Sequence, residues 1–548
     1  MKRVLATLLV VLAGLCHAQQ PAQTPPKLIV LIGLDQFRAG YLERYNEVFS
    51  GGFRRLMDEG IWYQNAIVDH APTLSLPGHT TLATGANPRT HGITSNAWID
   101  PRQEPAENGK LMATIPHLDP GVHTLGDKTV RAFSSQHIRV DGLADWVRQA
   151  DPGSRTVALS VSGLAVLYGG RSAQNRSDNH VYWLGSTGKF LTSSYYRDSY
   201  PDWINRFNEG MADKYVKQHV WDNTVPEKFW PLARQDKVDY EFDGVHTNFP
   251  HTAGELAQET NQKHYNWWFG RFSPYQNDAL FDLAQESIRQ LQLGQRDPVD
   301  LLSIAVKLTD RIGHDFGPRS LEQLDVILRL DRLLGEFLHY LDNSVGEDNY
   351  IIAVSADHGA PNISEYEQAN GREALRISSE DFEKALKSTA SLIRNHDDDQ
   401  QNLPRLIAEN LEQFPFISKA MSREDLEAND SNDATISAYQ NSYLAGQPTT
   451  YPLWTRDNRY GNLVSPLHPA NYGVIVELTG KANIWPAQST HGSSYQYDRE
   501  VPILFMGNGI KARIALETVY TRDIAPTLAR LSAVNYPETV EGSPLDLK

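Results

Sequence analysis

Short apolar runs rich in β-branched residues recur along the chain, and each of them ends in polar residues. Within a run the apolar residues follow one another without alternating with polar ones, which is typical of parallel strands buried on both faces. We therefore predict strands at Lys27–Leu34, Thr156–Val161, Leu301–Leu308, Tyr350–Val354, Tyr472–Leu478 and Val501–Met506.

Helical patterns separate these runs. The clearest one follows Ser320, where Ser320 and Gln323 form a capping-box pair and apolar residues from Leu321 to Leu341 mark one face. Strands that alternate with helices predict an α/β fold, with a central, mostly parallel sheet covered by helices on both faces.

Two regions break this rhythm. Residues 170–280, approximately, are rich in Trp and Tyr, and residues 365–465, approximately, are polar. We predict that both are insertions forming a cap on a domain that spans residues 19–548. The aromatic residues are interpreted as packing within the cap rather than as a ligand-stacking platform.

The N-terminus has the pattern of a secretory signal peptide over residues 1–18. Lys2 and Arg3 precede an apolar run that ends at Leu15, and Ala18 provides a small residue before cleavage. The run is too short for a membrane anchor, and no other stretch approaches membrane-spanning length. We expect a periplasmic or secreted protein without a membrane span once the signal is removed.

The composition narrows the possible partners and metal ligands. The 51 Lys and Arg residues against 67 Asp and Glu residues give a formal charge of -16, which argues against specific nucleic-acid recognition. The one cysteine, Cys16, lies inside the signal, so a metal site in the mature chain has to be built from His, Asp and Glu. The sequence does not indicate an oligomeric state.

Several predicted strands end in a potential metal ligand, and ligands of open α/β sheets bind at the carboxyl ends of strands. Singly, each has a structural explanation, such as capping of the next helix. Together they would repel without a cation among them, and oxygen and imidazole ligands favour zinc over manganese, iron or magnesium. The candidates are Asp35, Asp310, His314, Asp357, His358 and His491.

A second group of residues surrounds Ser75, which precedes Leu76-Pro77-Gly78-His79. Pro77 suits a first helical turn and Gly85 a C-terminal stop, so we expect Ser75 just before a short helix. Amides at a helix start attract anions, and a nearby metal would activate the hydroxyl as a nucleophile. The alternative is that Ser75 or Thr73 merely caps the helix.

These motifs, in this order, resemble the signatures of the alkaline phosphatase superfamily. The nearest branch is that of type I phosphodiesterases and nucleotide pyrophosphatases, with the secreted bacterial alkaline phosphatases related to them. The resemblance runs from about Lys27 to Leu545 and rests on Ser75–His79, His91–Ile93 with Asn96–Asp100, Thr309-Asp310 with Gly313-His314, Ala356–Gly359, His491-Gly492 with Tyr497-Asp498, and Asp523–Leu528.

The resemblance implies two zinc ions about 4 Å apart, the arrangement of two-metal hydrolases. It assigns Asp310, His314 and His491 to one ion, and Asp35, Asp357, His358 and Ser75 to the other. Ser75, where most relatives have Thr, would attack phosphorus to give a phosphoseryl enzyme. Asn96 would donate its amide hydrogens to a phosphoryl oxygen.

One departure from the family concerns the substrate. Monoesterases of this branch carry a Lys-x-Arg pair after a strand, and the matching positions here are Ser162 and Leu164. Because a diester has one charge fewer, the missing pair favours diester or nucleotide substrates. The alternative is an alkaline phosphatase, in which the missing positive charge would be supplied by Arg171, Arg176 or Lys189.

The sequence thus predicts an exported two-zinc hydrolase of small phosphate esters. Phosphodiesters are favoured and phosphomonoesters are the alternative. A hypothesis of a different functional class is that the protein is a non-catalytic phosphate-binding module with a relict metal site.

Overall fold

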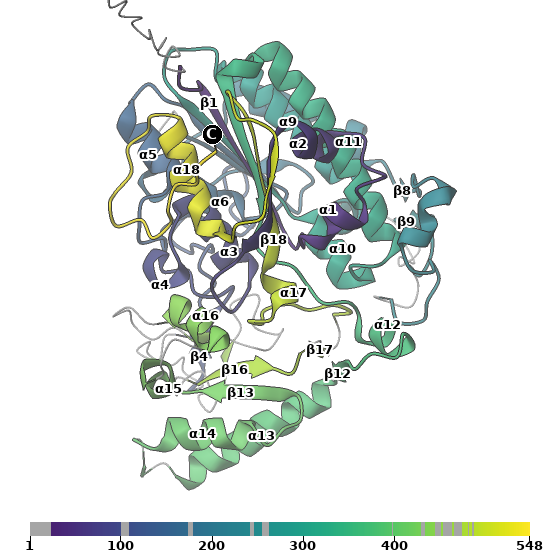
Figure 1. Cartoon of the computed structure of the whole chain (residues 1–548), viewed down its shortest axis with the longest axis vertical. Coiled ribbons are helices and arrows are strands. Elements are labelled where there is room, and N and C mark those ends of the chain that lie inside the picture. Colours follow the sequence, from purple (N-terminus) through teal and green to yellow (C-terminus); the bar gives the residue numbers. More distant parts are fainter. Residues whose placement is uncertain are drawn as a thin grey trace, which may run out of the picture.

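A ten-stranded sheet runs through the centre of the chain in the computed structural model (Figure 1). The structure describes residues 24–99, 109–173, 179–241, 246–254, 262–396, 398–399, 401–428, 433–443, 451–452, 463–464, 474–480, 482–484 and 487–547. The predicted signal peptide lies outside these residues.

Five neighbouring strands of the sheet are parallel, in the order β11, β1, β10, β5, β6, and strands of mixed direction flank them. The sheet consists of β1 (Leu28–Leu34), β2 (Ile61–Ile67), β5 (Thr156–Ser160), β6 (Asn179–Leu184), β7 (Phe190–Leu191), β10 (Asp300–Val306), β11 (Tyr350–Ala356), β18 (Glu500–Gly507), β19 (Arg513–Ala515) and β20 (Val519–Tyr520). The α/β prediction is confirmed.

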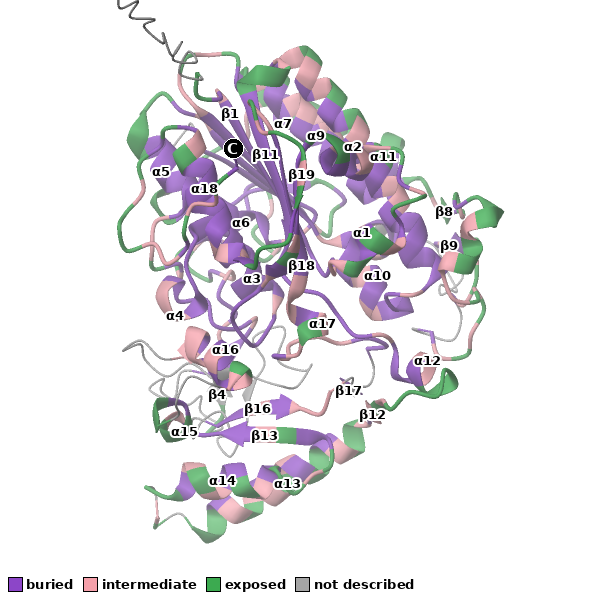
Figure 2. Ribbon diagram, viewed as in Figure 1, coloured by how far each residue is buried: buried purple, intermediate pink, exposed green. Residues whose placement is uncertain are grey.

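The central strand β1 shows why the sheet needs helices on both faces. All seven of its residues are buried. Leu28, Val30 and Ile32 pack into one hydrophobic cluster, whereas Ile29 and Leu31 pack into another. Successive side chains of a strand point to opposite faces, so each face carries its own apolar core, visible as the buried sheet in Figure 2.

Helices supply the other half of each cluster. The cluster on one face includes α1 (Gly40–Arg44), α2 (Gly52–Glu59), α9 (Tyr275–Leu291) and α11 (Leu321–Ser344). The cluster on the other includes α3 (Ser75–Thr84), α5 (Leu143–Ala150), α6 (Ala165–Tyr168) and α18 (Ile524–Leu531). Helix α11 begins as predicted, because the Ser320 hydroxyl accepts a hydrogen bond from the Gln323 amide at 3.0 Å.

Three of the predicted strands differ in detail from the structure. Strand β18, at the predicted Val501–Met506, is antiparallel to both of its neighbours. Leu308 belongs to α10 (Leu308–Phe316) rather than to the strand. The Tyr472–Leu478 run contributes β16 (Ile475–Leu478), which pairs with β13 (Ile417–Met421) outside the central sheet. Apolar content alone does not reveal which strand is the partner.

The first predicted insertion is partly sheet. Its strands β6 and β7 extend the edge of the central sheet. All six residues of β6 are buried, as in the central strands. The remainder packs beside α10, where Trp221, Trp268 and Phe316 share a cluster. The elements of this region are η1 (Arg171–Ala173), α7 (Asp202–Met211), η2 (Ala212–Val216), β8 (Val220–Trp221), η3 (Glu227–Leu232), β9 (His251–Thr252) and α8 (Gln262–Arg271).

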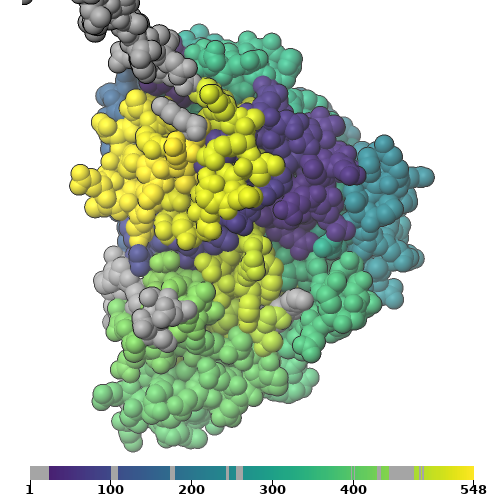
Figure 3. Space-filling view, viewed as in Figure 1, coloured from purple at the N-terminus to yellow at the C-terminus, as the bar shows by residue number. Residues whose placement is uncertain are grey.

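The second insertion forms a lobe with its own apolar core, centred on Phe382, Ile407 and Phe416. Figures 1 and 3 show it at one end of the molecule. Its elements are α12 (Ser364–Ala369), β12 (Leu375–Ile377), α13 (Ser379–Asn395), α14 (Leu403–Leu411), β13, α15 (Arg423–Ala428), α16 (Ala434–Tyr443), β14 (Tyr451–Pro452), β15 (Leu463–Val464), β16 and β17 (Ala482–Ile484). It therefore continues beyond the predicted end at 465.

Two short ladders join this lobe to the part of the chain before the central strand β5. Strand β14 pairs with β3 (Trp98–Ile99), and β15 pairs with β4 (Leu111–Met112). The remaining helical elements are α4 (Pro88–His91), η4 (Glu347–Asn349), α17 (Gln496–Arg499) and η7 (Thr521–Asp523). Among the described residues, none of the helices combines the length and the apolar character needed to cross a bilayer.

Candidate active site

The predicted ligands meet at the carboxyl edge of the three central strands. Asp35 directly follows β1, and Asp357 and His358 directly follow β11. Asp310 and His314 lie one turn apart on α10, the helix that follows β10. Because β1 lies between β10 and β11, the fold brings these side chains together, and the loop before α17 adds His491.

Three of the ligands form one group. Asp310 Oδ1 lies 3.1 Å from His314 Nε2 and 3.5 Å from His491 Nε2. The two imidazole nitrogens are 3.2 Å apart. This is the set that the family resemblance assigns to one ion.

The other predicted ligands form a second group beside the first. His358 Nε2 lies 3.2 Å from Asp357 Oδ2 and 3.6 Å from Asp35 Oδ1. Ser75 Oγ is 3.3 Å from Asp35 Oδ1. The His358 ring also stacks on His491, with ring centres 3.6 Å apart, so the two groups adjoin.

Ligand atoms that lie within 4.8 Å of one another also group these residues in another way. One cluster joins His358 to Asp310 and His491, and the other joins His79 to Asp35 and Asp357. Thus His358 lies between the two predicted sets. His79 is an additional group, to which the sequence analysis gave no role.

The histidine tautomers fit metal ligation. Nδ1 of His314, His358 and His491 each contacts a backbone carbonyl, of Ser489, Gly359 and Thr73 respectively, at 2.5, 2.9 and 2.8 Å. A carbonyl only accepts, so Nδ1 carries the hydrogen and the Nε2 lone pair faces the cluster. Lone pairs that face one another and a carboxylate favour a cation between them.

The burial of these ligands also favours a cation between them. Asp35, Asp357 and His358 are fully buried, and burial together with the Asp35 charge raises the pKa of Asp357 well above its usual range. Burial also holds the pKa of His358 well below its usual value. Asp357 Oδ2 and His358 Nε2 have no hydrogen-bond partner within the described part of the chain. Neutral imidazoles and buried carboxylates are the donor set that zinc prefers.

Ser75 is the first residue of α3, and its hydroxyl points to the ligands. The N-cap residue is Leu74, which has no side-chain cap, and Thr73 donates its hydroxyl to the Ser493 carbonyl at 2.8 Å. The capping alternative is therefore wrong. At the other end, Gly85 adopts the left-handed conformation with φ 66° and ends the helix as predicted.

Gly78 explains how α3 comes so close to the site. A Cβ at this position would lie 2.6 Å from the Asp357 carbonyl oxygen, which is far inside normal contact. The first turn of α3 therefore packs directly on the end of β11 because residue 78 has no side chain. This contact brings the Ser75 hydroxyl beside the carboxylates.

Asn96 lies at the same helix start. Its Oδ1 accepts a hydrogen bond from the Leu76 amide at 2.8 Å, and the side chain is half-buried. Because the side-chain oxygen of Asn96 is bonded to α3, the side chain can donate to another group only through its amide hydrogens. Asn96 thus contacts the first turn of α3, next to Ser75.

Ser162 and Leu164, the positions matched to the Lys-x-Arg pair, differ in their exposure to solvent. Ser162 is partly exposed, and its amide donates to Ser160 Oγ at 3.2 Å. Leu164 is 4% exposed and packs in the hydrophobic cluster with α6. An arginine at 164 would place its charge in that core.

The cations suggested as replacements lie elsewhere or are not described. Arg171 pairs with Asp141 at 3.3 Å and donates to the Arg139 carbonyl. Lys189 is exposed in the turn between β6 and β7. Arg176 lies outside the described residues.

Sequence reasoning missed a lysine within the cluster. Lys307 Nζ lies 2.7 Å from Asp35 Oδ2 and 2.6 Å from Asp310 Oδ2. Although burial acts against its charge, Asp310 and Asp35 raise the pKa of Lys307. The available signal was its place in the chain, three residues before Asp310 and directly after β10.

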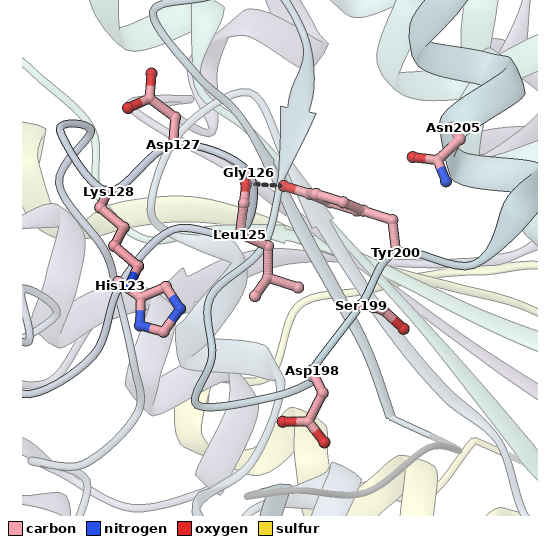
Figure 4. Close-up of a pocket in the computed structure, with 9 residues that line it drawn as sticks. All are labelled: His123, Leu125, Gly126, Asp127, Lys128, Asp198, Ser199, Tyr200 and Asn205. Carbon is pink, nitrogen blue, oxygen red and sulfur yellow. Dashed lines mark hydrogen bonds between the residues drawn. The ribbon is translucent and has the colours of Figure 1, made fainter.

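A separate pocket of about 540 Å³ lies between residues 123–128 and 198–200, with Asn205 of α7 at its wall (Figure 4). Tyr200 donates its hydroxyl to the Leu125 carbonyl across it at 3.1 Å. The pocket is lined by none of the predicted site residues.

Comparisons with known proteins show which family the chain resembles. Residues 29–447 match the family described as type I phosphodiesterase / nucleotide pyrophosphatase. Alkaline phosphatase PafA of Elizabethkingia meningoseptica is 29% identical, over 98% of this chain and 97% of that protein. Alkaline phosphatase PhoV of Synechococcus elongatus is 28% identical, over 93% and 91%.

A solved structure extends the likeness to three dimensions. The crystal structure of wild-type PafA superposes with a TM-score of 0.81 at 26% identity and covers 96% of this chain and 99% of that one. The chain therefore belongs to the type I phosphodiesterase / nucleotide pyrophosphatase family of the alkaline phosphatase superfamily and is a phosphoric ester hydrolase.

Proposed function

We propose that the protein is an exported two-zinc hydrolase of phosphate esters that acts through a phosphoseryl intermediate on Ser75. The observation that carries the proposal is the position of the Ser75 hydroxyl, 3.3 Å from Asp35 Oδ1, at the start of α3. This is the place where a nucleophile has to lie relative to a two-metal site.

The zinc ions would be held by Asp310, His314 and His491 on one side, and by Asp35, Asp357, His358 and Ser75 on the other. His79 faces the second group and is proposed to orient its carboxylates. Bound zinc would lower the pKa of the serine hydroxyl and neutralise charge on the phosphoryl group. The fit rests on the Nε2 lone pairs and on the buried carboxylates.

The chain's own residues would position the phosphoryl group for attack. Attack by Ser75 Oγ would form the oxygen–phosphorus bond as the bond to the leaving oxygen breaks, with the serine proton passing to the departing alcohol. Water would later cleave the phosphoserine, releasing phosphate from a monoester or a phosphate monoester from a diester. The amide hydrogens of Asn96 and the start of α3 are proposed to face the phosphoryl oxygens, where fixed donors stabilise developing charge.

The choice of ester has two candidate answers. The uncharged residues at Ser162 and Leu164 favour diesters, which need less cationic contact. Against this, two relatives that match more than nine-tenths of the chain are named alkaline phosphatases, which favours monoesters. Parallel kcat/KM measurements on an aryl phosphate monoester and its methyl diester would decide between them.

The intermediate can be tested directly. Acid quenching during turnover of a ³²P-labelled substrate should leave label on Ser75, found by peptide mapping, and Ser75→Ala should carry none. Turnover without labelled serine would contradict the covalent route. A protein that binds zinc and phosphate but hydrolyses no ester would be the non-catalytic alternative.

Export is proposed from residues 1–18 alone. Fractionation followed by N-terminal sequencing should find the mature chain outside the cytoplasm, beginning near Gln19. Retention of Met1 in the cytoplasm would contradict it.

A further inference from the structure

The cluster contains a cation that no part of the proposed chemistry uses. Lys307 is the first residue after β10, and its side chain is 17% exposed. Besides Asp35 and Asp310, its Nζ contacts Ser75 Oγ at 3.1 Å. One ammonium group thus touches a carboxylate from each ligand group and the proposed nucleophile.

The contact with Ser75 determines what else Lys307 can reach. When Oγ is bonded to phosphorus, a cation adjacent to Oγ lies against the oxygens of that phosphoryl group. A lysine ammonium has three donors on a flexible stem, so it can turn from a carboxylate to a phosphoryl oxygen without moving the backbone.

The strand register places Lys307 beside the missing pair. Ala305 of β10 is opposite Ser160 of β5, and the Ser160 hydroxyl donates to the Ala305 carbonyl at 2.8 Å. Lys307 lies two residues after Ala305, and Ser162 lies two residues after Ser160. The register thus puts Lys307, just past the end of β10, level with position 162, just past the end of β5, where the resemblance expects a lysine.

The next cation on the same helix is directed elsewhere. Arg311 donates to the carbonyl of Gly270 and to Gln276 Oε1, and lies 3.5 Å from the Val161 carbonyl. Its contacts hold the end of β5 and the start of α9. Lys307, in contrast, contacts the nucleophile itself.

We propose that Lys307 is a substrate-binding residue that donates to a non-bridging oxygen of the phosphoryl group on Ser75, and so equips the site for phosphate monoesters. This inference rests on the proposed function. Bound cations would neutralise Asp35 and Asp310 and leave the ammonium available to the substrate. Lys307 would contact the phosphoryl group through hydrogen bonds alone and form no covalent bond.

The test compares Lys307→Met with wild type on an aryl phosphate monoester and its methyl diester, after purification in zinc. Monoester kcat/KM should fall by on the order of ten- to a hundredfold, as for loss of one charge-assisted contact. Diester kcat/KM should change less than about threefold. Lys387→Met, on the exposed face of α13, is the matched control and should change neither.

Two readouts do not depend on turnover. The affinity for inorganic phosphate, measured by calorimetry, should fall about as much as the monoester kcat/KM, and zinc content should stay at the wild-type value. The double change Lys307→Ser with Ser162→Lys moves the cation to the segment that follows β5 and should recover most of the monoester activity.

Several outcomes would overturn the proposal. Equal losses on both esters would make Lys307 a positioning residue for Ser75. A gain of zinc in Lys307→Met would mean that the ammonium takes the place of an ion. Selective monoester loss in Lys189→Met with none in Lys307→Met would assign the charge to the β6–β7 turn. If wild type hydrolyses neither ester, the proposed function fails instead, and phosphate affinity still reports on Lys307.

Discussion

The Tyr168 hydroxyl lies 2.7 Å from Nδ1 of His79, deep behind the ligand cluster. Burial raises the pKa of Tyr168 well above its usual value, so the phenol keeps its proton and can donate it to Nδ1. Nε2 of His79 then carries the hydrogen, and it lies 3.4 Å from Asp35 Oδ2 and 3.5 Å from Asp357 Oδ2. The phenol thereby fixes which side of the ring faces the carboxylates.

Gly33 makes room for this pair and provides the first prediction. A Cβ at residue 33 would lie 2.2 Å from the Tyr168 hydroxyl oxygen and 2.9 Å from His79 Nδ1. Gly33→Ala should therefore lower zinc affinity by on the order of ten- to a hundredfold, as for other groups that orient metal ligands. Chelator competition measures it. Gly40→Ala, where a Cβ meets open space, should bind zinc like wild type.

The second prediction concerns the nucleophile. Ser75→Ala should reduce kcat by on the order of a thousandfold or more and keep most of its zinc, because other ligands remain. Ser75→Thr should retain measurable turnover, since the hydroxyl stays. Wild-type rates in Ser75→Ala would assign the attack to another group.

Removal of metal gives the third prediction. The protein should contain about two zinc ions, as two-metal hydrolases do, and a chelator should abolish activity that added zinc restores. The melting temperature should fall on chelation, because a ligand that binds the native state stabilises it. Full activity in excess chelator would contradict the zinc assignment.

Single ligand changes are the fourth prediction. Asp310→Ala and His358→Ala should each remove most of the activity, since an incomplete set holds its metal less tightly and less accurately. Zinc content per chain should fall below that of Ser75→Ala. His358→Ala should have the broader effect, because His358 contacts both ligand groups.

The fifth prediction is a pH effect on stability at the junction with the lobe. Glu477 of β16 accepts from the Tyr439 hydroxyl at 2.7 Å and from the Ser494 amide at 3.1 Å, close to His491. Burial raises the pKa of Glu477 to about 7. The native state then binds a proton that the unfolded chain releases, so the free energy of unfolding falls as pH rises from about 4.5 to 7.

Glu477→Gln should remove this dependence, which amounts to about 3 kcal/mol over the interval. Denaturant melts of wild type and variant at pH 5 and pH 8, in equal zinc, measure the difference. Glu383→Gln on the exposed side of α13 should melt with the wild-type pH dependence. Parallel curves for wild type and Glu477→Gln would show that Glu477 is not the group responsible.

Most ligand residues were predictable because they directly follow a strand, as Asp35 does, or lie on the helix that follows one, as Asp310 does. Asp35 and Asp357 illustrate this, since parallel neighbours β1 and β11 deliver their carboxyl ends to one edge. His491 lies in a loop instead, ahead of β18. The partners of β16 and β18 were not predictable, because an apolar run does not encode strand direction. Lys307 and Tyr168 were missed because their roles depend on which strand or helix lies next to them.

The ligands span the chain from Asp35 to His491, so the site depends on contacts between residues far apart in sequence. During synthesis, a chain that has not yet reached His491 has every proposed ligand of the second group but lacks one ligand of the first. If the two groups bind zinc as proposed, the first group would be completed last. For a chain exported before it folds, the supply of zinc in the destination compartment, rather than in the cytoplasm, would set how much active protein forms.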